Sequence, residues 1–144
     1  ARGGFTNLPA GSIFIAPVEN KTTGIVYFDG GVEGNINNPV RLEIKKGKIT
    51  RVPKYAKLDP FIDKRSDCSV TVSQLGFGMN PEANVIGNIL QDEKAKGTVH
   101  LGFGENRSFG GKIKCRTHFE GVMVEPTVEA DGEIIIEKGD WVVL

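Results

Sequence analysis

Two histidines and one nearby carboxylate are the residues of this chain that could bind a metal ion. His118 and Glu120 stand two apart in THFEGV, and in a strand such residues point to the same face. The other histidine, His100, lies in the apolar run TVHLGFG, just before glycines. Two imidazoles and a carboxylate form a ligand set of both zinc hydrolases and non-haem iron oxygenases. The alternative interpretation of H-x-E is the solvated face of an ordinary strand.

Two glycine-bearing segments are weaker candidates for contact with a ligand. The stretch LGFGMNPEAN at 75–84 leads from a strand toward a helix, and it is either an anion-binding turn or a plain capped turn. The loop GENRSFGG at 104–111 carries Arg107 and Ser108. It is either a loop that contacts a substrate carboxylate or a plain surface turn. Neither segment matches a phosphate-binding motif, and the chain shows no signature of a catalytic Ser/His/Asp or Cys/His set.

Short strand signals run through the chain and position these residues. Apolar or alternating runs bounded by turn residues predict strands within 11–18, 22–31, 40–52, 68–81, 98–104 and 117–144. In VRLEIK the apolar residues alternate with charged ones, and Asp131-Gly132 is the expected turn of a hairpin within 117–144. A helix is expected within 82–97, where Gly87 interrupts the pattern, and a short one could lie in 53–68. The fold class is therefore α+β: a β-rich domain of about eight mostly antiparallel strands with one or two short helices.

Composition limits the classes of partner. With 144 residues and 39% hydrophobic side chains, the chain is long and apolar enough for one packed domain. Its 18 basic residues equal its 18 acidic ones, so charge does not direct it to nucleic acid or to an anionic membrane. No apolar run approaches the roughly 20 residues that span a bilayer.

The two cysteines carry a separate expectation. Cys68 and Cys115 have no CxxC spacing, and two cysteines do not make a disulfide framework. We expect two reduced thiols in a cytoplasmic protein.

Three long blocks of sequence resemble a known family. The segments at 7–19, 74–111 and 118–136, with LGFGMNP, GTVHLGFG and HFEGVMVEP at their centres, are similar to the C-terminal half of aminopeptidase T and aminopeptidase S, metallopeptidases of the leucyl aminopeptidase type. The resemblance implies that residues 1–144 are the C-terminal metal-site domain of a longer two-domain protein. Its N-terminal α/β domain is absent from this sequence, and catalytic metals would lie in the cleft between the two domains.

The same resemblance assigns metal ligands residue by residue. It implies that His100, His118 and Glu120 hold metal, with glutamate where the family usually has aspartate. Ser12 and Gln74 stand where the family has two further glutamates. Neither residue carries a charge to neutralise a second cation, so one metal is expected to remain where relatives hold two. A related branch, the 2,5-dihydroxypyridine dioxygenases, holds one iron with two histidines and an acid.

These observations leave three functions open. The first is a metal-dependent aminopeptidase-like hydrolase, using Zn²⁺, Co²⁺ or Mn²⁺ and a peptide substrate. The second is a mononuclear non-haem Fe(II) dioxygenase that cleaves the ring of a small dihydroxypyridine-type molecule. The third is a degenerate relative without catalysis. Glu93 is the candidate general base, or else an acid on a helix surface. The resemblance also implies a possible homodimer, and the fragment alone is expected to be inactive.

Replacement of one histidine tests the proposed ligand set. The variant His118→Ala should lose metal binding while the fold stays largely intact, because a ligand that faces a cleft packs against little of the core. Metal titration and thermal unfolding of the variant measure the two effects. Unfolding of the variant, with a metal content that never depended on His118, would show that the assignment is wrong.

Overall fold

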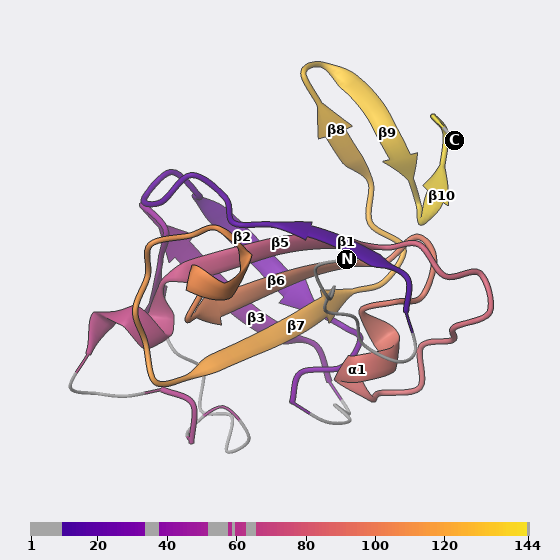
Figure 1. The fold of residues 1–144 in the computed structure, drawn as a ribbon. Coiled ribbons are helices and arrows are strands. Elements are labelled where there is room, and N and C mark those ends of the chain that lie inside the picture. The colour runs from indigo at the N-terminus through magenta and orange to yellow at the C-terminus, as the bar shows by residue number, and fades with distance from the viewer. Residues whose placement is uncertain (1–9, 34–37, 52–57, 59, 63–65, 144) are drawn as a thin grey trace, which may run out of the picture.

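A computed structural model describes residues 10–33, 38–51, 58, 60–62 and 66–143 (Figure 1). Ten strands dominate it, together with one short α-helix, α1, and two 3-10 turns, η1 and η2. In chain order the elements are β1 (Ser12–Ile15), β2 (Gly24–Phe28), β3 (Val40–Lys45), β4 (Lys48–Arg51), η1 (Asp67–Val70), β5 (Val72–Gly78), α1 (Ile89–Asp92), β6 (Val99–Gly104), η2 (Arg107–Phe109), β7 (His118–Met123), β8 (Val128–Ala130), β9 (Glu133–Glu137) and β10 (Asp140–Trp141).

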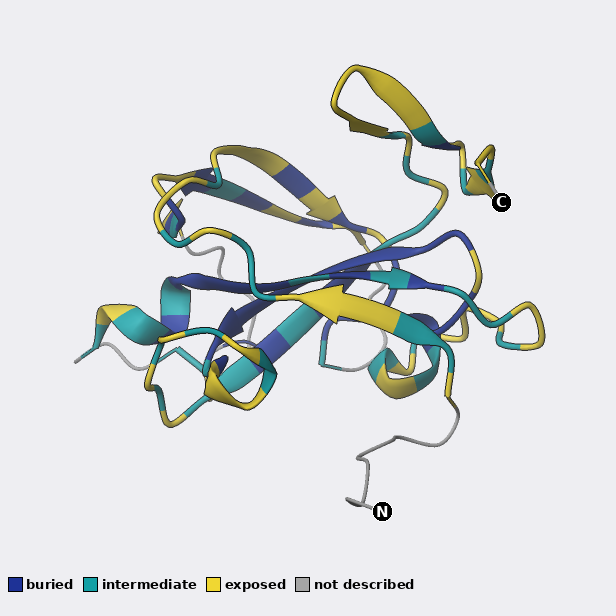
Figure 2. Cartoon of the chain, turned by 45° about the horizontal axis from the view of Figure 1, so that its top comes forward, coloured by how far each residue is buried: buried dark blue, intermediate teal, exposed yellow. Residues whose placement is uncertain are grey.

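The strands form three antiparallel sheets. The largest has the order β1-β5-β6-β7, the second β2-β3-β4, and the third β10-β9-β8. The third sheet projects from the other two in both views and is mostly exposed (Figures 1 and 2). The predicted β-rich class is confirmed, and so is the turn at Asp131-Gly132, which joins β8 to β9.

The core lies between the first two sheets. Strand β3 alternates as the sequence predicts, with Val40, Leu42 and Ile44 buried and its charged residues outside the core. On the facing sheet, Phe103 of β6 stacks on Phe119 of β7 with ring centroids 4.9 Å apart. Side chains of both sheets form one apolar cluster, which fixes the position of β6 and β7 relative to the rest of the domain.

The helix predicted within 82–97 is much shorter than expected. Only α1 is helical; the Asn88 side chain caps it by accepting a hydrogen bond from Leu90 N at 3.1 Å. Gly87, before the cap, has a φ of +82°, which is outside the helical region. Asn80 pairs with Ala95 in an isolated parallel bridge, so the chain after α1 returns to β pairing. Most of the second suggested helix, at 53–68, lies outside the described residues.

Among the described residues, no helix is long and apolar enough to cross a membrane.

The expectation of two reduced thiols is wrong, because Cys68 and Cys115 form a disulfide. Cys68 lies just before β5 and Cys115 just before β7. Both strands run antiparallel to β6, so they are parallel to each other and begin at the same end of the sheet. Spacing in sequence could not reveal this proximity. Disulfides are typical of oxidising compartments, so the bond weighs against the predicted cytoplasmic location.

Removal of this disulfide should destabilise the domain. The bond joins residues 47 apart, and closing a loop of that length restricts the unfolded chain by about 2–4 kcal/mol. The double variant Cys68→Ser/Cys115→Ser should lose that much free energy of unfolding in urea titration. Reductant should lower the stability of the unaltered protein to the same level and leave the double variant unchanged. Two titratable thiols in the folded, unreduced protein would contradict the assignment.

Candidate metal centre

The four-stranded sheet has one apolar face and one polar face. On β6, Leu101 and Phe103 belong to the core, whereas His100 and Gly102 point to the opposite side. The register places Glu120 of β7 directly beside Gly102. All six residues of β6 are buried. The polar face is therefore an interior surface, where charged groups need partners.

Two glycines make room for the histidine rings on this face. A Cβ atom on Gly76 of β5 would lie 2.0 Å from Nε2 of His100, and one on Gly102 would lie 3.1 Å from Cε1 of His118. Both imidazoles therefore lie over bare backbone of the neighbouring strand. Any side chain at Gly76 would occupy the space of the His100 ring.

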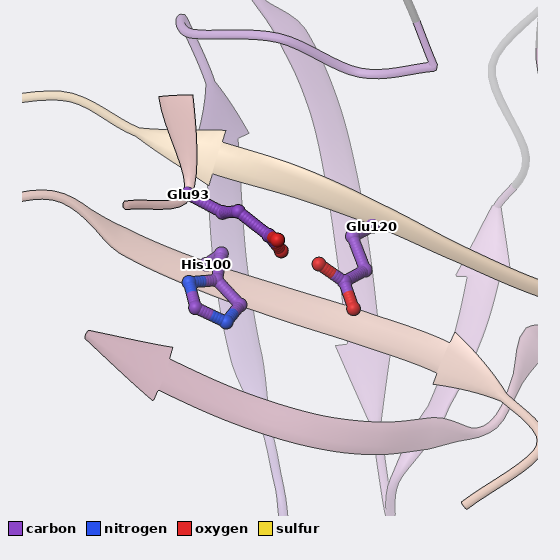
Figure 3. Close-up of side chains that lie close together, drawn as sticks. All are labelled: Glu93, His100 and Glu120. Carbon is purple, nitrogen blue, oxygen red and sulfur yellow. The ribbon is translucent and has the colours of Figure 1, made fainter. Parts of the chain in front are cut away.

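Three side chains from three segments lie close together on this face (Figure 3). Glu93 follows directly after α1, His100 comes from β6 and Glu120 from β7. Each offers one ligand atom, and these atoms all lie within 4.8 Å of one another. The carboxylates of Glu93 and Glu120 point toward each other (Figure 3). Oxygen and imidazole nitrogen are donors that Zn²⁺, Mn²⁺ and Fe²⁺ accept.

His118 joins this group through Glu120. Its Nε2 lies 2.8 Å from Oε1 of Glu120, and its Nδ1 lies 2.9 Å from the carbonyl oxygen of Glu105. Burial alone would lower the pKa of His118, but the hydrogen bond and charge of Glu120 raise it above the usual value. The predicted residues His100, His118 and Glu120 thus share one face, and Glu93 lies with them.

The pKa values of Glu93 and Glu120 are shifted in opposite directions. Burial and the hydrogen bond to Glu120 raise the pKa of Glu93. Burial would also raise the pKa of Glu120, but hydrogen bonds from His118 and Glu93 bring it below its usual range. These opposite shifts favour a protonated Glu93 beside an ionised Glu120. A metal ion that bound Glu93 would displace this proton.

The side chain of His100 fits a metal ligand. Burial lowers its pKa to about 4, so the ring is neutral at neutral pH and one nitrogen carries a free lone pair. Within the described residues, both ring nitrogens and Oε2 of Glu120 are buried without a hydrogen-bond partner. Buried polar atoms without partners are rare and call for an explanation, such as a bound ion. The residues present therefore fit a divalent cation.

Two further acids were not recognised in the sequence. Asp92 is fully buried, and its carboxylate accepts hydrogen bonds from the backbone N–H groups of Gly31, Ile86 and Gly87 at 2.8–3.2 Å. These bonds fix the segment that presents Glu93. Glu33 accepts from the backbone N–H of Glu120 at 3.4 Å. No local motif marks either residue, since their partners lie on separate segments.

A buried lysine contacts one of the two positions where the resemblance implied a glutamate. Lys94 bonds to Oε1 of Glu93, and its ammonium donates to Oγ of Ser12 at 3.1 Å. Ser12 and Gln74 both lie on the polar face, on β1 and β5. The ammonium group of Lys94 thus places a positive charge near Ser12. Ser12 is one of the positions where the resemblance implied a ligand of a second metal ion.

A cavity of about 200 Å³ opens beside the cluster. The loop 104–111 contributes Ser108 and Phe109 to its wall. Arg107 of the same loop does not line it, because its guanidinium binds both carboxylate oxygens of Glu105. The full lining within the described residues is Phe14, Gln74, Glu93, Lys94, Ser108, Phe109, His118 and Glu120.

Comparisons with known proteins place this chain in one protein family. The family model described as NicX, 2,5-dihydroxypyridine 5,6-dioxygenase, matches residues 1–143. A solved structure of 2,5-dihydroxypyridine dioxygenase from Pseudomonas putida KT2440 has the same fold, with a TM-score of 0.76 and 22% sequence identity. The alignment covers 91% of this chain and 43% of that one, so the chain spans less than half the length of that dioxygenase. No curated protein matches the chain.

The prediction of a hydrolase, an aminopeptidase and a metalloprotease is wrong. The family that matches nearly the whole chain is one of dioxygenases. The long shared blocks favoured the aminopeptidases, whereas Ser12 and Gln74 depart from the aminopeptidase pattern. Ser12 hydrogen-bonds to Lys94, and neither it nor Gln74 offers the carboxylate that a metal pair needs. The related dioxygenase branch, given as the alternative, is the better-supported identity.

Substitution of Gly76 should damage the site without altering any polar group. In Gly76→Ala the new methyl group would overlap the His100 ring, so the ring must move and affinity for a divalent metal should fall at least about tenfold, by about 1.4 kcal/mol. Isothermal titration with Zn²⁺ measures this.

The matched control for Gly76→Ala is Gly121→Ala on β7. Its methyl group would meet the ring of Phe28 on the core face, so it should lower the melting temperature instead of affecting metal affinity specifically. Unchanged zinc affinity in Gly76→Ala would contradict the placement of His100.

Proposed function

We propose that this chain, which belongs to the NicX family of 2,5-dihydroxypyridine 5,6-dioxygenases, carries the metal site of a ring-cleaving dioxygenase that acts on a small dihydroxylated heteroaromatic molecule. The observation that carries the proposal is the buried Glu93, His100 and Glu120 cluster, whose His100 nitrogens have no partner among the described residues. Family membership supplies the reaction class, and the cluster supplies a place for the metal.

The proposed ligands are His100, His118 and Glu120, and the proposed ion is a single Fe(II). Two imidazoles and one carboxylate are typical of non-haem Fe(II) oxygenases, in which open positions remain for substrate and oxygen. Bound iron would supply the site where oxygen and the ring exchange electrons. His118 already directs Nε2 toward Glu120, and the Glu105 carbonyl oxygen on Nδ1 fixes the orientation of its ring.

Glu93 is proposed to handle a proton. The bond to Lys94 already occupies Oε1 of Glu93, which disfavours it as the third ligand. Its raised pKa keeps it protonated at neutral pH, so it is better suited to donate a proton than to act as the general base expected from the sequence. This proton lies within the cluster, where a developing oxyanion on the substrate could receive it.

An N-terminal α/β domain completing the cleft is part of the proposal. The chain's coverage of 43% of the solved dioxygenase supports a longer functional protein. The predicted homodimer and cytoplasmic location stay predictions.

Metal analysis and oxygen uptake test the proposed function. The full-length protein should take up one Fe(II) per subunit and consume oxygen when 2,5-dihydroxypyridine is added. The variants His100→Ala and Glu120→Ala should lose iron. Glu93→Gln should keep iron and lose at least tenfold in turnover, because it cannot donate the proton. Glu129→Gln, on the exposed strand β8, is the control and should behave as the unaltered protein.

Three outcomes would count against parts of this proposal. A folded protein that takes up no metal when Fe(II) is added has no such site. Iron binding without oxygen uptake on dihydroxypyridine removes the proposed reaction. Iron loss in Glu93→Gln, with iron retained in His118→Ala, makes Glu93 the third ligand in place of His118.

A further inference from the structure

Lys94 is a charged side chain in an unusual place. Its residue is 4% exposed, although lysine is almost never buried without a function or a pair. An ammonium group has three N–H donors. Within the described residues, the hydrogen-bond partners of this group are Ser12 and Glu93. One donor therefore remains for a ligand in the cavity that Lys94 lines.

The cavity around Lys94 has aromatic walls. Phe14 and Phe109 meet edge to face with ring centroids 5.6 Å apart, and Phe109 meets His118 in the same way at 5.8 Å. A volume of about 200 Å³ is below the roughly 300–1,000 Å³ of pockets for drug-sized ligands. The size and the rings favour one planar ring as the ligand.

A ring ligand that carries an anionic oxygen needs a positive charge beside it in this cavity. Glu120 lines it, and its carboxylate repels an anionic oxygen unless a positive charge faces it. Within the described lining, Lys94 is the one lysine, and no arginine contributes. Its low exposure excludes much of the solvent that would otherwise screen its charge.

We propose that Lys94 binds the ionised ring hydroxyl of the substrate and so selects hydroxylated aromatic rings in their anionic form. The substrate class rests on the proposed function, whereas the ion pair is a property of this cavity. The substrate hydroxyl gives its proton to solvent on binding, and no bond within the ring changes. Phe14 and Phe109 contact the ring, and Lys94 sets which edge of the ring points toward it.

A purely structural role predicts a different result. If Lys94 only held Ser12 and Glu93 in place through its hydrogen bonds, its loss would change the metal content or the stability of the protein and leave the ionisation of a bound phenol unchanged. The ionisation of a bound probe therefore separates the two roles.

The test uses 4-nitrophenol, whose phenolate absorbs in the visible. The full-length protein is loaded with Zn²⁺, which carries no redox chemistry. At a fixed pH, the ratio of phenolate to phenol among bound probe should be at least tenfold higher in the unaltered protein than in Lys94→Met, with equal zinc content. Lys94→Arg should keep most of the preference. Lys96→Met, which removes an exposed lysine two residues away, is the matched control and should change nothing.

Equal phenolate ratios in the unaltered protein and Lys94→Met would overturn the inference, and so would loss of zinc from a folded Lys94→Met. If Lys94→Met does not fold, Lys94→Gln replaces it, and a retained phenolate preference there overturns the inference in the same way. Failure of the proposed function is distinguishable. A protein that prefers phenolate through Lys94 but consumes no oxygen with 2,5-dihydroxypyridine keeps the ion pair and loses the reaction.

Discussion

The organisation of this domain follows from one constraint: β6 is buried on both of its faces. One face meets the apolar core, where Phe103 stacks on Phe119. The other carries His100, and polar groups buried there need partners. Glu93 and Glu120 lie beside His100 on this face, and each carboxyl group shifts the pKa of the other.

Asp92 connects the surrounding loops to the segment that carries the site residues. Its carboxylate binds backbone N–H groups at 31, 86 and 87, so it joins the segment beside β7 to the turn before α1. The next two residues, Glu93 and Lys94, are the ones presented to the cavity. The Asp92 carboxylate thus holds this segment in place through hydrogen bonds, although only four residues of the expected helix form.

Sequence reasoning succeeded where the signal was local. Alternation in VRLEIK and the turn residues at Asp131-Gly132 predicted β3 and the β8–β9 connection, because period-two burial and turn chemistry are local properties. Strand spacing placed His118 and Glu120 on one face, but the full set of His100, His118 and Glu120 was assigned as ligands through a family resemblance. The Cys68–Cys115 bond, the roles of Asp92 and Glu33, and the Lys94–Ser12 contact depend on strand order, which no local pattern contains. The family resemblance left the reaction open between a hydrolase and a dioxygenase.

The Cys68–Cys115 bond has a consequence for ligand binding. The loop that ends at Cys115 supplies Ser108 and Phe109 to the cavity wall, and its Glu105 carbonyl oxygen orients His118. A covalent closure restricts this loop before any ligand arrives, so the conformational entropy of ordering the wall is lost during folding and not during binding. The disulfide therefore makes this side of the cavity preorganised, although neither cysteine belongs to the group of Glu93, His100 and Glu120.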